Sequence, residues 1–270
     1  MNTIELRGKL QKGELVLGTL IVSSSPFWPK LLVNCPLDFV FIDTEHIAIN
    51  RVDLSWMCRT YSAMGYPPLV RMKSPDPYIA TQFLDDGASG VISPYTETID
   101  QVKELVGATK KRPIKGLKLN GIMEGNEIET KLDKYMSQFN DHNLLILNIE
   151  SKPALENLNS ILEIKGIDAI QIGPHDLTSS LGIPEEYENT IYLKTIEKIF
   201  KKARSKSIGA GIHAWGDPKY QKKLIDMGAN MIIHKADAIF FQEGLQKEIN
   251  KIKELVSNDK GKKLEKKIKI

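Results

Sequence analysis

Two carboxylates stand at the ends of apolar segments that read as neighbouring buried strands. Glu150 closes the segment Leu144–Glu150, and Asp176 follows the segment Ile167–Ile172 after a Gly-Pro break. A helical segment between them would make the two strands parallel, so their C-terminal ends would open on the same side. Paired carboxylates in that position suit a hard divalent cation that keeps open positions for a substrate. The alternative is that both carboxylates only cap the helices that follow.

Two other predicted strands also end in residues that can do chemistry. One ends in Asp43-Thr44-Glu45-His46, and the next ends in Arg71. Asp43 is close enough to His46 to orient the imidazole and raise its basicity, an arrangement known for a general base. Taken singly, Arg71 could pair with Asp76, His46 could be an idle surface histidine, and Glu45 could be a helix cap or a supporting partner.

As a set, these residues can bind a metal and a 2-oxo acid. The metal would take the keto oxygen and one carboxylate oxygen of the substrate, while Arg71 would stabilise the negative charge that appears as an enolate forms. A nearby base would move the proton that bond cleavage releases. Only Lys73 and Lys118 flank predicted strand ends, so Schiff-base catalysis by a lysine is less favoured. His213 and Trp215 are better explained as pocket wall or loop packing than as catalytic residues.

Short apolar segments alternate with amphipathic helical segments along the chain, and these elements would position the polar residues. The predicted strands are Leu15–Val22, Leu37–Asp43, Pro68–Met72, Gly90–Ser93, Ile114–Leu119, Leu144–Glu150, Ile167–Ile172, Ile208–His213 and Asn230–His234. The predicted helices are Arg51–Met64, Asp76–Asp85, Ile99–Thr109, Lys152–Ile164, Asn189–Ser205, Pro218–Met227 and Ala238–Val256.

About eight strand–helix units with continuously apolar strands indicate an α/β fold, a (β/α)8 TIM barrel in a single domain. Polar residues gather at the strand C-terminal ends, as the catalytic face of a barrel requires. A dinucleotide site is disfavoured because no Gly-x-Gly-x-x-Gly follows the first strand. We expect residues 120–141 to form a loop or lid.

The composition is that of a globular protein, with 41% apolar residues, 26% charged residues and a net charge of +3 over 270 residues. This balance gives no reason to expect nucleic acid or a membrane as partner. The two cysteines lack metal or disulfide spacing and no segment is apolar enough to span a membrane, so we expect a cytoplasmic protein. The barrel should span residues 1–258, and the Lys-rich residues 259–270 should form a flexible tail.

Three segments resemble the HpcH/HpaI family of metal-dependent class II pyruvate aldolases. They are FVFIDTEH, PLVRMKSPDPYIATQFLDDGASGVISPYTET and LNIESKPALENLNSILEIKGIDAIQIGPHDLTSSLG. They resemble the family's Asp-x-Glu-His strand end, its Val-Arg-x to Gly-Val-x-x-Pro block, and its Ile-Glu to Ile-Gly-Pro-x-Asp-Leu block. The likeness extends from Val16 to the Gly228-Ala229 joint, and the motifs stand in the family's order and spacing.

The resemblance implies a barrel that holds Mg2+, Mn2+ or Co2+ through Glu150 and Asp176. It implies that Arg71 binds the pyruvyl oxygen and that His46, supported by Asp43, is the base acting on the 4-hydroxyl. The expected substrates are a small 2-oxo acid and an aldehyde. The expected assembly is a homohexamer, a trimer of dimers, in which the helix Ala238–Val256 packs on a neighbouring subunit. The substrate-binding residues would be Arg71, Asn148, Gly173, Pro174 and His175.

The chain departs from the family pattern around this machinery. Asn148 stands where the family has Gln, His175 where a small residue is common, and Lys115-Gly116 where it has Arg-Gly. Thr44 replaces a glycine, and HKAD at residues 234–237 replaces Gly-Ser-Asp. The first hypothesis is therefore an aldolase that cleaves or forms a 4-hydroxy-2-oxo acid. A citrate-synthase-like synthase of the siderophore type is the second, and a non-catalytic barrel that binds small carboxylates is the third.

Overall fold

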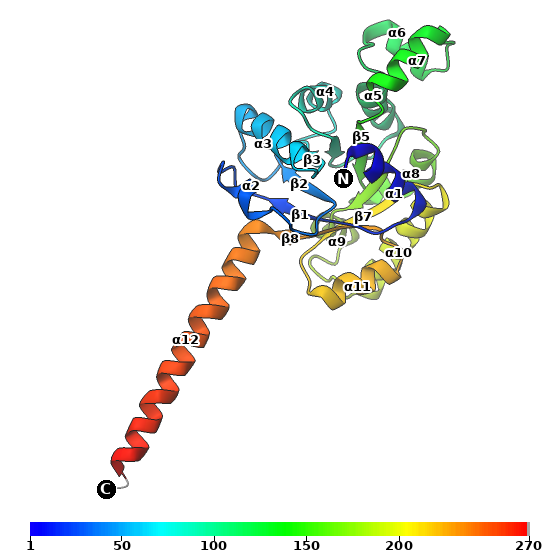
Figure 1. Cartoon of the computed structure of the whole chain (residues 1–270). Helices are drawn as coiled ribbons and strands as arrows, with labels where there is room; N and C mark the ends of the chain where they lie inside the picture. Colours follow the sequence, from blue (N-terminus) through cyan, green and yellow to red (C-terminus); the bar gives the residue numbers. More distant parts are fainter. Residues whose placement is uncertain (269–270) are drawn as a thin grey trace.

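Eight parallel strands form a closed barrel in the computed structural model, which describes the backbone of residues 1–268 and side-chain burial for residues 1–257 (Figure 1). Each strand pairs with the next along the chain, and β8 pairs with β1. The strands are β1 (Val16–Ile21), β2 (Phe39–Asp43), β3 (Pro68–Arg71), β4 (Gly90–Ser93), β5 (Leu144–Asn148), β6 (Ala169–Ile172), β7 (Gly209–Ala214) and β8 (Met231–Ala236). The predicted single-domain (β/α)8 barrel is confirmed.

The strands are apolar on both faces because both faces are covered. In β2, Phe39 and Phe41 belong to the cluster that fills the barrel, whereas Val40 and Ile42 pack beneath the surrounding helices. All four side chains are completely buried. Burying a side chain of this size contributes about 1.5–3 kcal/mol, so the two clusters together hold the barrel closed. This explains why the strands read as continuous apolar runs rather than as alternating ones.

The N-terminal end of the barrel is plugged by helix α1 (Thr3–Lys12). Its Leu6 and Leu10 are fully buried in the cluster inside the barrel, and the helix begins with a capping box formed by Asn2 and Glu5. Gly209 lets this helix approach, since a Cβ there would lie 2.9 Å from the Leu10 side chain. The opposite end, where the strands terminate, is left for the site.

The predicted helices between the strands are also present, within a few residues at each end. They are α3 (Arg51–Ala63), α4 (Pro77–Asp85), α5 (Ile99–Lys110), α8 (Lys152–Leu162), α10 (Thr190–Ser205) and α11 (Pro218–Asp226). Each begins after a residue whose side chain accepts a hydrogen bond from the first turn, in order Asn50, Asp76, Thr98, Ser151, Asn189 and Asp217. The short helices α2 (Trp28–Leu31) and α9 (Pro174–Leu181), like α1, were not predicted from the sequence.

The prediction of a strand at Ile114–Leu119 is wrong. These residues lead into helix α6 (Gly116–Met123), which is followed by helix α7 (Thr130–Phe139), so the predicted loop at 120–141 is largely helical. The strand next to β4 is β5, in register with Gly90 opposite Leu144. Alternating apolar residues suggested the extra strand, but Leu117 is 89% exposed and the barrel is already complete without it.

Helix α12 (Asp237–Ile268) contains the predicted helix Ala238–Val256 and projects away from the barrel (Figure 1). At its start, the Asp237 carboxylate accepts hydrogen bonds from the backbone N–H groups of Val22, Ser23 and Ala238. The helical backbone continues to Ile268, so the expected tail begins as a continuation of α12; its flexibility stays a prediction, and residues 269–270 lie outside the described residues. Within the part that is described, no helix combines the length and apolar character needed to cross a membrane.

Candidate active site

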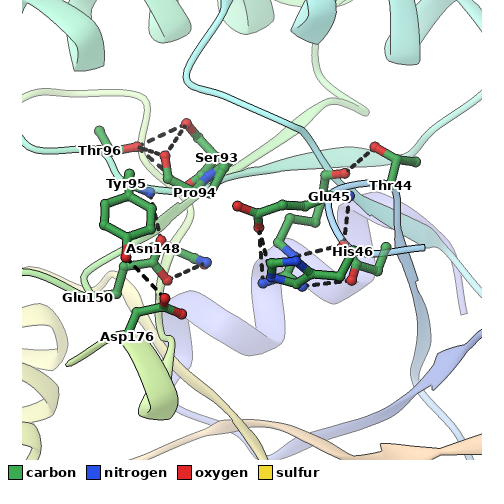
Figure 2. A network of polar contacts seen from close by, with 12 residues as sticks. Thr44, Glu45, His46, Ser93, Pro94, Tyr95, Thr96, Asn148, Glu150 and Asp176 are labelled. Atoms are coloured by element: carbon green, nitrogen blue, oxygen red, sulfur yellow. Dashed lines mark hydrogen bonds and ion pairs between the residues drawn. The ribbon is translucent and has the colours of Figure 1, made fainter. Parts of the chain in front are cut away.

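The C-terminal ends of β2 to β6 bring together the residues that the sequence singled out. Asp43 ends β2, Arg71 ends β3, and Asn148 ends β5. Figure 2 shows Glu150, Asp176 and Tyr95 on one side of this mouth, facing Glu45 and His46 on the other. Asp43, Arg71 and Asn148 are held by the strand ends themselves, whereas Tyr95, Glu150 and Asp176 lie within a few residues beyond them.

Glu150 is held in a tight polar cradle. It is 1% exposed, its Oε1 accepts a 2.7 Å hydrogen bond from the backbone N–H of Tyr95, and its Oε2 accepts a 2.9 Å bond from the Asn148 amide. A Cβ at Gly173 would lie 2.2 Å from this Oε2, so only glycine leaves room for the carboxylate. Burial raises the pKa of Glu150 to about 7, because few groups offset the loss of water around the charge.

Asp176 lies in the first turn of α9, where its Oδ1 accepts a 3.0 Å hydrogen bond from the Tyr95 hydroxyl. The capping alternative is therefore wrong for both carboxylates. Helix α8 is capped by Ser151, and the cap residue of α9 is Gly173, which has no side chain to cap with. The carboxylates of Glu150 and Asp176 face the mouth instead.

Tyr95 is the residue of this mouth that the sequence did not point to. Its backbone has φ +42°, in the left-handed region that costs a residue other than glycine about 1–3 kcal/mol. The loss of water on burial, and then the hydrogen bond to Asp176, raise the pKa of the Tyr95 phenol to about 12, so the hydroxyl stays protonated as a donor. The signal in the sequence was only its place after the Ser93-Pro94 strand end.

Arg71 is fixed by a two-point ion pair with Asp43. Its Nε and Nη2 lie 2.9 and 2.7 Å from the two Asp43 oxygens, and its Nη1 lies 3.2 Å from Glu45 Oε2. Burial alone would raise the pKa of Asp43, but the hydrogen bonds and charge of Arg71 outweigh it and hold that pKa below its usual range. Asp43 therefore fixes the position of the Arg71 guanidinium.

The expected pairing of Asp43 with His46 is not what the described residues show. The His46 side chain is 64% exposed, and its Nε2 lies 3.7 Å from Glu45 Oε2. Glu45 thus stands between the base candidate and Arg71. Burial raises the pKa of Glu45, although the positive charge of Arg71 opposes this effect. Glu45 thus lies beside both His46 and Arg71, the place that a supporting partner would take.

The rings of Phe41, His213 and Trp215 form a line beside Arg71. The Phe41 ring lies 5.6 Å from Arg71 Cζ and 5.6 Å from the His213 ring, which lies 4.5 Å from Trp215. Burial lowers the pKa of His213 to about 4, and its Nε2 lies 3.1 Å from the Lys235 carbonyl. A neutral imidazole must donate there, which leaves Nδ1 as the acceptor.

His175 and Lys118 each lie near a glutamate that is not among the proposed site residues. The His175 side chain is 66% exposed and its Nδ1 lies 3.8 Å from Glu185 Oε1. Lys118 pairs with Glu129, 2.9 Å away, on helix α6 outside the barrel. Pro174 is the first residue of α9. Among the predicted substrate-binding residues, Arg71, Asn148 and Gly173 lie around Glu150.

The oxygen donors in the mouth fit a divalent cation. Glu150 and Asp176 contribute carboxylates, and Asn148 Oδ1 is buried without a hydrogen-bond partner beside them. Among the described residues, no three His, Cys, Asp or Glu side chains are grouped as a complete protein cage. A pair of carboxylates with an amide oxygen suits Mg2+ or Mn2+, which prefer oxygen ligands and keep positions for water or substrate.

The sequence pattern of the HpcH/HpaI aldolase/citrate lyase family matches residues 21–238. The chain belongs to this family. It is 29% identical over 240 residues to 2-keto-3-deoxy-L-rhamnonate aldolase of Klebsiella pneumoniae, covering 89% of this chain and 90% of that protein. This placement confirms the predicted family and the carbon–carbon lyase class. Class II aldolases of this family depend on a divalent metal.

Two solved structures share the fold over most of the chain. The HpcH/HpaI aldolase from Desulfitobacterium hafniense DCB-2 superposes with a TM-score of 0.79 at 25% identity, covering 92% of this chain and 96% of that one. Citrate synthase SbnG superposes with a TM-score of 0.77 at 25% identity, covering 92% and 97%. An aldolase and a synthase therefore resemble this chain about equally.

Proposed function

We propose that this protein is a class II aldolase that cleaves or forms a 4-hydroxy-2-oxo acid through a pyruvate enolate. The observation that carries the proposal is that Glu150 and Asp176 both accept hydrogen bonds from Tyr95. Arg71 lies at the same mouth of the barrel and is close enough to affect the pKa of Glu150. Two carboxylates alone would suit many metal enzymes. A guanidinium fixed beside them adds a site for the negative charge that develops on a 2-oxo acid.

A divalent cation held by Glu150 and Asp176 would supply Lewis acidity that withdraws electrons from the keto carbon. Arg71 binds the substrate oxygen and stabilises the enolate charge, while Asp43 and Glu45 keep the guanidinium in place. The wall of Phe41 and His213 excludes water from one side of Arg71, which strengthens that interaction.

His46 is the proposed base that takes the proton of the 4-hydroxyl, directly or through a water molecule. Its exposure leaves the imidazole accessible to a bound substrate, and Glu45 is near enough to stabilise the imidazolium that results. Asp43 then contributes by positioning Arg71. Lys235 lies near the end of β8, where the sequence did not predict a lysine. Its amine pairs with Glu243, 2.6 Å away, so Schiff-base catalysis by this lysine is less favoured.

The proposal extends to partners and location as the sequence indicated them. The substrates are a small 2-oxo acid and an aldehyde, the metal is Mg2+, Mn2+ or Co2+, and the location is the cytoplasm. The assembly is a homohexamer in which α12 packs on a neighbouring subunit. The exposed Phe241, Leu245 and Ile252 on α12 support such a contact, since isolated helices rarely leave so many large apolar side chains in water.

A synthase that joins another enolate to a 2-oxo acid is the second candidate, and the likeness to citrate synthase SbnG favours it. The two reactions can be told apart by product analysis. The protein is incubated with Mn2+ and pyruvate plus short hydroxyaldehydes, or with Mn2+ and oxaloacetate plus a 2-oxo acid, and the products are identified by mass spectrometry. Hydroxy-oxo acids from the first mixture alone support the aldolase. Products from the second mixture alone would reject it in favour of the synthase, and products from neither would leave the small-carboxylate binding barrel.

A further inference from the structure

Tyr95 contacts both proposed metal ligands with two different groups. Its backbone N–H donates to Glu150 Oε1 at 2.7 Å, and its hydroxyl donates to Asp176 Oδ1 at 3.0 Å. Glu150 follows β5, Asp176 follows β6, and Tyr95 itself follows β4. One residue thus links three consecutive loops of the barrel mouth (Figure 2).

The turn that carries Tyr95 is held by a side-chain hydrogen bond between the residues that flank it. The Thr96 hydroxyl is buried and donates to Ser93 Oγ at 2.9 Å, which ties the two ends of the turn together. This anchoring keeps the backbone of Tyr95 at φ +42°, a conformation that directs the N–H toward Glu150 while the ring reaches Asp176. Strain of this kind persists only where the surroundings over-determine it.

The residue type at this position is informative. Glycine or asparagine would adopt a positive φ with less strain and would offer the same N–H to Glu150. The side chain of Tyr95 is also 45% exposed, so burial of its ring does not account for it. What tyrosine adds is a hydroxyl at the distance that reaches Asp176.

We propose that Tyr95 is a positioning residue that holds Glu150 and Asp176 in the arrangement that receives the metal. This inference rests on the proposed function, since it takes the two carboxylates as metal ligands. Groups that hydrogen-bond metal ligands orient them, and their loss typically weakens metal affinity about 10–100-fold. Removing the hydroxyl frees the Asp176 carboxylate to rotate, whereas Glu150 keeps its backbone partner.

The test is the affinity for Mn2+ of the full-length protein and of Tyr95→Phe, measured by the electron paramagnetic resonance signal of unbound Mn2+. Tyr95→Phe should bind Mn2+ at least about tenfold more weakly, with an unchanged unfolding midpoint in chelator. Aldol activity should recover as Mn2+ is raised to saturation. The matched control is Tyr135→Phe, half exposed and stacked on Phe139, which should bind Mn2+ like the wild type.

A second variant separates the side chain from the backbone. Tyr95→Gly removes the hydroxyl and the strain together, so it should raise the unfolding midpoint while Mn2+ binding weakens at least as much as in Tyr95→Phe. Equal Mn2+ affinity of the wild type and both variants would overturn the role of Tyr95 and leave the metal site intact. If Glu150→Ala leaves Mn2+ binding at the wild-type level, the proposed ligands are wrong, and both the function and this inference are overturned.

Discussion

Arg71 and Asp43 face each other across the register of β3 and β2 and share two parallel hydrogen bonds. An arginine held at two points presents its remaining N–H groups in a fixed direction, which suits the binding of a developing enolate oxygen. Both oxygens of Asp43 accept hydrogen bonds from Arg71, so we assign Asp43 to positioning Arg71 and not to supporting His46.

This division of roles predicts different effects for two acidic residues. Asp43→Asn keeps only one acceptor for Arg71, so we expect kcat to fall about 10–100-fold while the acidic limb of the pH profile of kcat/KM moves less than in Glu45→Gln. Glu45→Gln should instead move that limb to lower pH, because it removes the carboxylate that stabilises a positive charge on His46. A limb that moves in Asp43→Asn and not in Glu45→Gln would reverse the two assignments.

The raised pKa of Glu150 predicts that its charge destabilises the metal-free fold. Because the pKa rises from 4.5 to about 7 on folding, the native state holds the proton between these values and the unfolded chain does not. The loss of folding stability caused by this charge is complete well above pH 7 and disappears below pH 4.5. Glu150→Gln should therefore stabilise the metal-free protein by roughly 3 kcal/mol at pH 8, given about 1.4 kcal/mol per pKa unit, and by little at pH 4.5.

Urea unfolding in chelator measures this difference. The control is Glu156→Gln, an exposed glutamate on α8, which should change stability by less than about 0.5 kcal/mol at either pH. Equal free energies of unfolding for Glu150→Gln and the wild type at pH 8 would show that ionising Glu150 does not destabilise the metal-free fold.

The ion pairs at the plugged end of the barrel should matter for stability and not for the site. Asp168 is buried and accepts bonds from Arg7 at 2.8 Å, Lys110 at 2.5 Å and the Leu145 N–H at 2.8 Å. Asp168→Ala leaves buried positive charge without a partner and should cost about 3–5 kcal/mol in urea unfolding. Asp226→Ala, which breaks an exposed pair with Lys222, should cost less than about 1 kcal/mol. Mn2+ affinity should be unchanged in both folded variants.

Assembly through α12 predicts a sharp difference between two positions one residue apart. Phe241, Leu245, Ile249, Ile252 and Val256 follow helical spacing and share one face, whereas Asn250 lies on the opposite face. Ile249→Glu should lower the mass measured by light scattering during size-exclusion chromatography. Asn250→Glu, which adds the same charge, should leave the mass unchanged. Identical masses for both variants and the wild type would exclude this face as the contact.

Much of the barrel could be predicted because its strands are continuously apolar and its helices begin at capping residues such as Asp76 and Thr98. The segment Ile114–Leu119 misled because short apolar alternation does not separate strand from helix, and only closure of the eight-stranded barrel excludes it. The positions of Asp43 and Arg71 at strand ends could be predicted from the apolar segments that precede them. Their partners could not, since Asp43 pairs across strands with Arg71 rather than along the chain with His46. Tyr95 depends on three loops meeting, which no local pattern encodes.

The most direct test of the central claim follows the methyl protons of pyruvate in D2O by 1H NMR, in the presence of Mg2+ and then with chelator. Enolate formation at this mouth predicts loss of the methyl signal that depends on protein and on metal, and that is abolished in Arg71→Ala and in Glu150→Ala. It requires no knowledge of the aldehyde. Exchange that persists in both variants, or no exchange with Mg2+, Mn2+ or Co2+, would contradict the account.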